Sequence, residues 1–191
     1  MQNTDDREMG MVIVDLDGTM SDHSARYAEF AKDGDLEKFH SGFDQDPPTA
    51  HARHIWNFME RMPARDVFFF VSMRYEKHMT GTIKWMVEHI SPHFQNFLVP
   101  QGSDPKKTFI MGNIKGEGLL QARMRQIREC FHRRAAEAKA QGMEKGSAIL
   151  FEDNLQNSYS AAREFPKLAI FRPYSWRNPE GALWMHGSEI E

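Results

Sequence analysis

Two carboxylates one residue apart, Asp15 and Asp17, are the residues in this sequence whose types and spacing most clearly suggest chemistry. They follow a short apolar run, residues 11–14, which favours a buried β-strand because it is brief, largely β-branched and soon ended by Gly18. Side chains alternate faces along a strand, so both carboxylates point the same way at its carboxyl end. Two anions directed into one pocket predict a hard divalent cation such as Mg²⁺, whereas a surface turn is the alternative for such a pair taken alone.

Length and composition limit the classes of protein to consider. The chain has 191 residues, enough for one α/β domain with a small insertion, and its net charge of −3 excludes a globally basic nucleic-acid binder. The single cysteine, Cys130, excludes an intramolecular disulfide and is expected to be a buried structural residue. Because the amino terminus is acidic and polar and no apolar run approaches membrane-spanning length, we expect a cytoplasmic protein.

Apolar patterns along the chain alternate between strand and helix, which predicts a parallel sheet with helices packed on it. The predicted strands span residues 11–14, 67–71, 97–99, 147–151 and 167–171, and the predicted helices span residues 49–62, 78–90, 117–140 and 157–165. Residues 20–48 contain glycines, prolines and scattered charges and are interpreted as a flap or short helical insert. Residues 172–191 are interpreted as a tail that wraps the surface.

Further polar residues follow two other predicted strands. Ser72 and Arg74 come after the strand at residues 67–71, and Glu152 and Asp153 come after the strand at residues 147–151. The carboxyl ends of parallel strands meet at one edge of an open sheet, where such folds place their sites. The planar fork of an arginine matches two phosphate oxygens, so Arg74 is a candidate phosphate ligand at this edge.

The string V-I-V-D-L-D-G-T at residues 12–19 resembles the first motif of the haloacid dehalogenase (HAD) superfamily of phosphohydrolases. Ser72 and Asp153 resemble its second and fourth motifs, and they occur in the same order along the chain. The resemblance covers residues 11–171 and implies a HAD-like Rossmannoid fold of three α/β/α layers. It further implies five parallel strands in the order 5-4-1-2-3. The chain length indicates one domain over residues 1–191, and the short stretch between Ser72 and Lys115 leaves no room for a large cap there.

The resemblance also implies roles for the polar residues at the strand ends. In that family the first aspartate, here Asp15, attacks phosphorus, and the second, here Asp17, is the general acid and base. The hydroxyl of Ser72 would bind the transferring phosphoryl group. Mg²⁺ would be held by Asp15, the backbone carbonyl of Asp17 and Asp153, with Glu152 nearby through water.

HAD enzymes need a lysine after the third strand to offset the negative charge between the nucleophile and the phosphate. Lys106, Lys107 and Lys115 are the candidates in this sequence. Lys115 is favoured because the segment N-I-K-G-E-G-L opens the long predicted helix and resembles the V-V-K-E-E segment of the polynucleotide kinase phosphatase family.

Two arginines suggest a narrower resemblance within the superfamily. Arg26 stands eleven residues beyond Asp15, the spacing at which the phosphatase domain of phage polynucleotide kinase carries a functional arginine. Arg74 matches the arginine of the Ser-Gly-Arg sequence found in many relatives of that phosphatase. The resemblance implies that Arg26, Arg74 and Thr19 bind substrate and that the enzyme removes a 3′-phosphate from nucleic-acid or nucleotide ends.

Two other functions stay open. A nucleoside 5′-monophosphatase would share all of this chemistry, and a HAD-fold binding protein without turnover would be indicated by the departures Met73 and Glu152, although the retained Asp17 favours chemistry. The long predicted helix also bears on the choice of substrate, because its basic residues would either guide a polynucleotide backbone or form an ordinary solvated face. These basic residues are Arg123, Arg125, Arg128, Arg133, Arg134 and Lys139.

Overall fold

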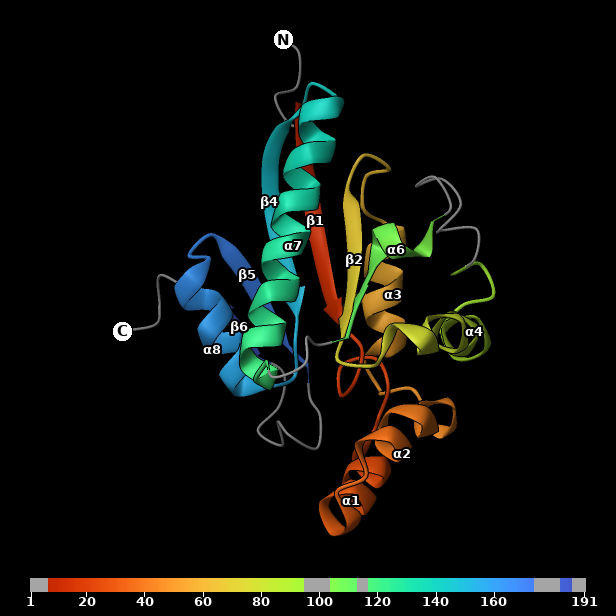
Figure 1. The fold of residues 1–191 in the computed structure, drawn as a ribbon. Helices are drawn as coiled ribbons and strands as arrows, with labels where there is room; N and C mark the ends of the chain where they lie inside the picture. The colour runs from red at the N-terminus through yellow and green to blue at the C-terminus, as the bar shows by residue number, and fades with distance from the viewer. Residues whose placement is uncertain (1–6, 95–103, 113–116, 174–182, 187–191) are drawn as a thin grey trace.

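A six-stranded sheet lies between two layers of helices in the computed structural model, which describes residues 7–94, 104–112, 117–173 and 183–186 (Figure 1). The strands are β1 (Glu8–Asp15), β2 (Val67–Ser72), β3 (Phe109–Met111), β4 (Glu144–Phe151), β5 (Leu168–Arg172) and β6 (Leu183–His186). Their order is β3-β2-β1-β4-β5-β6, and the first five are parallel. The predicted five-stranded parallel sheet and its order are therefore confirmed.

The two edges of the sheet differ from the prediction. The strand that pairs with β2 is Phe109–Met111, which follows the short helix α6 (Pro105–Thr108), whereas the strand predicted at residues 97–99 lies outside the described residues. At the other edge, β6 pairs antiparallel with β5 and buries Met185 opposite Ile170. Part of the segment predicted to wrap the surface therefore extends the sheet.

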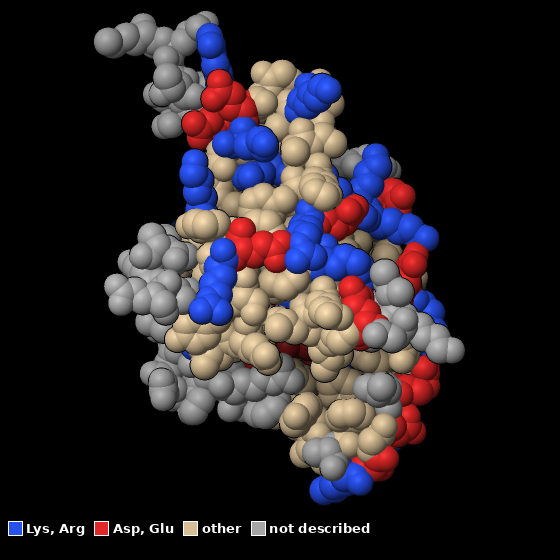
Figure 2. All heavy atoms as spheres, turned by 60° about the vertical axis from the view of Figure 1, so that its left-hand side comes forward, with Lys and Arg blue, Asp and Glu red and all other residues tan. Residues whose placement is uncertain are grey.

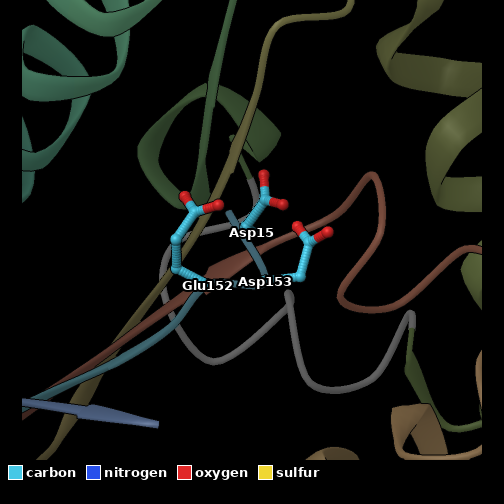
Figure 3. A group of neighbouring side chains, drawn as sticks. All are labelled: Asp15, Glu152 and Asp153. Atoms are coloured by element: carbon cyan, nitrogen blue, oxygen red, sulfur yellow. The ribbon is translucent and has the colours of Figure 1, made fainter. Parts of the chain in front are cut away.

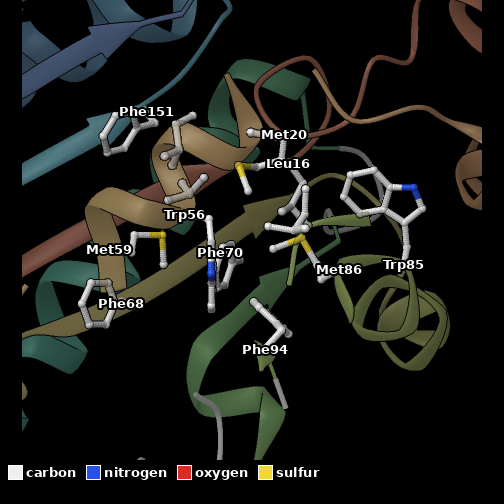
Figure 4. Close-up of a cluster of buried hydrophobic side chains, with 14 of the residues drawn as sticks. Leu16, Met20, Trp56, Met59, Phe68, Phe70, Trp85, Met86, Phe94 and Phe151 are labelled. Carbon is white, nitrogen blue, oxygen red and sulfur yellow. The ribbon is translucent and has the colours of Figure 1, made fainter. Parts of the chain in front are cut away.

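The sheet has helices on both faces, as predicted. On one face lie α3 (Ala52–Glu60) and α4 (Met79–His89), and on the other lie α7 (Leu119–Ala140) and α8 (Leu155–Glu164) (Figure 1). Strand β1 is buried on both sides: Val12 and Val14 belong to the apolar cluster under α3 and α4, shown in Figure 4, and Met11 and Ile13 belong to the cluster under α7 and α8. This two-sided burial fixes the position of β1, whose carboxyl end carries the first motif.

Residues 20–48 form a helical insertion beyond the carboxyl end of β1 (Figure 1). Its elements are α1 (Ser24–Asp33), α2 (Leu36–Ser41) and the 3-10 turn η2 (Gly42–Gln45). Phe43 of η2 is buried against α4, where a Cβ at Gly81 would lie only 2.8 Å from its ring. The indole N–H of Trp85 on α4 donates to the backbone carbonyl of Asp46, at 2.8 Å. The insertion is thus anchored on the main body of the fold.

In the part of the chain that the structure describes, no helix combines the length and the apolar character needed to cross a membrane.

Candidate active site

The ends of β1 and β4 bring three carboxylates together, those of Asp15, Glu152 and Asp153 (Figure 3). Their closest oxygen atoms all lie within 4.8 Å of one another, and each residue is at most 1% exposed. The hydroxyl of Thr19 donates to Asp15 Oδ2, at 3.4 Å, and accepts the backbone N–H of Asp153, at 3.1 Å. Thr19 therefore connects the two strand ends beneath the cluster.

The chemistry of these donors fits a divalent cation. Three buried carboxylates lie together beside the guanidinium of Arg123, and hard divalent cations prefer such oxygen ligands. The backbone next to the cluster is also specialised, because Gly18 has φ of +99° and a Cβ there would lie 2.3 Å from Asp153 Oδ2. The turn after β1 thus requires glycine both for its conformation and for room beside Asp153.

Arg123 of α7 lies in the site, a position that the sequence did not indicate for it. It is 4% exposed, one of its amino groups (Nη2) donates to Asp15 Oδ1, and its Nε lies 3.2 Å from Glu152 Oε2. Burial lowers the pKa of Arg123, but the charges of Asp15 and Glu152 outweigh burial and raise it, so the guanidinium stays charged. Burial raises the pKa of Glu152 despite the opposing charge of Arg123.

Gln126, one turn along α7, fixes Arg123 in place. Its side-chain oxygen accepts from Arg123 Nη1, at 3.2 Å, and its amide nitrogen donates to the backbone carbonyls of Ser72 (2.8 Å) and Gly112 (3.0 Å). These bonds join α7 to the carboxyl ends of β2 and β3. The long helix is therefore held in the rotation that directs Arg123 toward Asp15.

The predicted lysines are placed differently. Lys115, the favoured candidate, lies outside the described residues. Lys106 and Lys107 are exposed on α6, before β3 begins, and the ammonium group of Lys106 pairs with Glu76 at 2.5 Å. Among the described residues, Arg123 supplies the positive charge beside Asp15 that the prediction expected from a lysine.

Asp17 directs its side chain toward a second set of residues. It accepts from the hydroxyl of Ser72, at 3.0 Å, from Nε and Nη2 of Arg74, at 3.0 and 2.8 Å, and from Nη2 of Arg26, at 2.9 Å. Burial raises the pKa of Asp17, but the guanidinium groups of Arg74 and Arg26 outweigh it and hold that pKa well below its usual range. Any metal contact of Asp17 would therefore use its backbone carbonyl, as the resemblance implies.

Arg74 is enclosed on every side. It is 0% exposed, its guanidinium lies 4.4 Å from the centre of the Phe43 ring, and it donates to the hydroxyls of Ser21, at 2.9 Å, and Thr82, at 3.3 Å. Its backbone N–H donates to the hydroxyl oxygen of Ser72, at 3.0 Å. Arg74 thus belongs to the same network as Asp17.

Eight predicted site residues come together at the carboxyl edge of the sheet, in two connected groups. These residues are Asp15, Asp17, Thr19, Arg26, Ser72, Arg74, Glu152 and Asp153. Asp15 and the metal-binding candidates form the first group, and Asp17 with its arginines forms the second.

The arginines of α7 do not form the basic face that was considered from the sequence. Arg125 pairs with Glu117, Arg128 with Glu164 and Arg133 with Glu129. Arg123 lies inside the site, and Arg134 is buried with its guanidinium on two backbone carbonyls of β4. Figure 2 shows acidic and basic side chains interspersed on this side of the molecule.

Comparison with solved structures shows a similarity of fold. A class C acid phosphatase from Bacillus anthracis, solved with tungstate bound, matches with a TM-score of 0.50 and 16% sequence identity over 90% of this chain and 68% of that chain. Neither a protein-family model nor a curated protein matches the sequence. The chain therefore shares its fold with this acid phosphatase, and the comparison does not test the narrower polynucleotide kinase resemblance.

Proposed function

We propose that this protein is a divalent-metal-dependent phosphomonoesterase in which Asp15 is the nucleophile. The observation that carries the proposal is the separation of the two neighbouring carboxylates into different environments. Asp15 lies with Glu152, Asp153 and Arg123, where charge on a phosphate can be offset, and Asp17 lies in a network of hydrogen-bond donors suited to orienting a proton-transfer group. The phosphatase fold supports the same conclusion.

The proposed reaction has two steps. An oxygen of Asp15 forms a bond to phosphorus as the bond to the ester oxygen breaks. Asp17, which takes up a proton when a phosphate draws Arg26 and Arg74 away from its carboxylate, gives that proton to the departing alcohol. Asp17 then takes a proton from a water molecule that attacks the aspartyl phosphate, which releases inorganic phosphate and restores Asp15. A divalent cation bound by the three carboxylates would neutralise charge on the phosphoryl oxygens.

The remaining residues would bind and orient the phosphate. Arg123 is positioned to offset charge between Asp15 and the phosphoryl group, the role that the resemblance assigns to a lysine. Arg74, Arg26, Thr19 and Ser72 are the proposed substrate contacts, and a phosphate would reach the two arginines by sharing or exchanging their bonds to Asp17.

We propose a phosphorylated nucleotide or nucleic-acid end as the substrate, with a 3′-phosphate as the first choice because of the spacing of Arg26 and Arg74 from their motifs. A mononucleotide is the second candidate, and a specific observation favours it. The arginines on the outer face of α7 are paired with glutamates, so they offer little attraction for a long polynucleotide backbone.

The test measures phosphate release by the full chain with Mg²⁺. Generic aryl phosphate, a 3′-phosphorylated oligonucleotide and nucleoside 3′- and 5′-monophosphates are compared, each with and without EDTA. We expect Mg²⁺-dependent turnover that Asp15→Asn abolishes and that Asp66→Asn retains, since Asp66 is a buried aspartate bonded to Gly10 N–H in the interior of the fold. Absence of turnover on every ester would refute the phosphatase proposal, and turnover of mononucleotides alone would refute the polymer substrate.

A further inference from the structure

We propose that Asp46, in the insertion, is a positioning residue that holds Arg26 against Asp17 and so aligns the acid–base carboxylate. The inference rests on the proposed function and adds to it a residue that neither the sequence motifs nor the fold points to. It gives the helical insertion a part in the chemistry beyond covering the site.

The contacts of Arg26 show what orients its guanidinium. Its Nε donates to Asp46 Oδ1, at 2.7 Å, and its Nη2 to Asp46 Oδ2, at 2.5 Å, which is a bidentate pair. The same Nη2 donates to Asp17 Oδ1, at 2.9 Å, and Nη1 donates to the backbone carbonyl of Phe39. The guanidinium also lies over the Phe39 ring, 4.6 Å from its centre. Asp46 therefore fixes the plane of the fork so that one hydrogen of Nη2 is directed at the site.

Asp46 is itself held rigidly by the main body of the fold. It is 4% exposed, its carbonyl accepts from the indole N–H of Trp85, at 2.8 Å, and its backbone N–H donates to the carbonyl of Phe43, at 3.2 Å. A continuous series of hydrogen bonds thus runs from α4 through Asp46 and Arg26 to Asp17. A displacement of Asp46 would therefore displace Arg26 and, through it, the carboxylate of Asp17 that transfers the proton.

Asp46→Asn keeps the size of the side chain but disrupts the pair. It removes the negative charge and directs an NH₂ group at one of the two nitrogens of Arg26, where two donors then face each other. Arg26 loses its fixed orientation, and Asp17 loses one of its aligned donors. Misplacement of an aligned group by a distant change lowers rates by about 10- to 100-fold.

The experiment compares two esters that differ in their need for a general acid. The alcohol that leaves glycerol phosphate must be protonated as it departs, whereas the dinitrophenolate ion that leaves dinitrophenyl phosphate departs without a proton. We expect Asp46→Asn to lower kcat/KM for glycerol phosphate by about 10-fold more than for dinitrophenyl phosphate. Asp66→Asn, a matched change of a buried aspartate away from the site, should leave the ratio of the two kcat/KM values unchanged.

A double-mutant cycle separates positioning from general support of the fold. If Asp46 acts through Arg26, Asp46→Asn has no further effect on the kcat/KM ratio once Arg26→Gln is present. Should Asp46→Asn fail to fold, Arg26→Lys serves instead, because it keeps the charge but cannot form the bidentate pair, and the same selective loss is expected.

Two results would overturn the inference while leaving the proposed function intact. One is an Asp46→Asn enzyme with wild-type kcat/KM on both esters, and the other is an equal loss on both esters that persists in the Arg26→Gln background. Absence of turnover by the wild-type chain on both of these esters and on every nucleotide and oligonucleotide ester tested above would instead refute the phosphatase proposal, and this inference with it.

Discussion

Replacing Arg123 by methionine tests whether the buried carboxylates need a cation. Arg123 is paired with Asp15 and Glu152, and all three are almost fully buried. Removing one partner of a buried ion pair costs about 3–5 kcal/mol. Because the pKa of Glu152 is already raised by burial, Glu152 can take up a proton, so we expect the lower value, about 3 kcal/mol. For a domain of this size that corresponds to a decrease in Tm of roughly 6–12 °C.

The assay measures Tm in EDTA and in excess Mg²⁺, at several pH values. A bound divalent cation replaces the missing positive charge, so the difference from wild type should be smaller in Mg²⁺ than in EDTA. The folded state of Arg123→Met binds a proton at Glu152 that the unfolded chain has released, so its stability in EDTA should fall as the pH rises through the folded pKa. Arg128→Met is the matched control on the same helix. The Arg128 side chain, which pairs with Glu164, is 51% exposed, and exposed ion pairs contribute little to stability.

Equal Tm values for Arg123→Met and Arg128→Met in EDTA would refute this reasoning. A decrease for Arg123→Met that is independent of both Mg²⁺ and pH would also refute it, since the loss would then come from packing and not from charge.

Three further predictions concern single residues. Asp17→Asn should lower the free energy of unfolding at neutral pH by about 3 kcal/mol, measured by urea unfolding. The pKa of Asp17 is depressed in the folded state, so the stabilisation by its charge is lost when it is protonated, and the difference from wild type should close as the pH falls below the ordinary aspartate value of 3.8. Gly18→Ala should weaken Mg²⁺ binding measured by calorimetry, because its Cβ would meet the Asp153 carboxylate, whereas Gly34→Ala, also at positive φ but with open space around it, should cost only about 1 kcal/mol of stability. Burial raises the pKa of the Cys130 thiol, so a thiol reagent should modify Cys130 only after denaturant is added.

The carboxyl edge of the sheet was predictable because strand geometry determines it. Once β1, β2 and β4 are recognised as buried parallel strands, the residues that follow them must meet at one edge, and Asp15, Ser72 and Asp153 do so. The insertion was predictable as a segment, since its glycines and prolines interrupt the apolar pattern. The pairing of Asp46 with Arg26 was not, because the two residues stand twenty positions apart, with the rest of α1, α2 and η2 between them.

Arg123 was missed because hydrophobicity alone places charged residues on the outer face of a helix. Apolar spacing predicts an inward stripe on α7 made of Leu120, Met124, Ile127, Phe131 and Ala135. Met124 and Ile127 are buried as predicted, and Arg123 and Cys130, which the stripe omits, are buried as well. Arg123 stands four residues before Ile127 and seven before Cys130, which is the spacing of one helical face. An arginine on the same helical face as a buried cysteine was the feature of the sequence that could have indicated a buried Arg123.

The third strand illustrates a different limit. Residues 97–99 and Phe109–Met111 are both short apolar runs, and neither has the length or alternation that identifies a strand. Pairing with β2 and burial of Phe109 against the aromatic ring of Phe70 distinguish the second run, and both are tertiary properties.

Strand β6 has a consequence for self-association. A parallel sheet that ended at β5 would present a row of unpaired backbone N–H and C=O groups, which is a template for pairing with another copy of the chain. The antiparallel β6 covers the outer side of β5 from Ala169 to Arg172, and at the opposite border β3 is only three residues long. A chain shortened to end after Pro173 is therefore expected to aggregate through β5, even though every residue of the candidate active site would still be present.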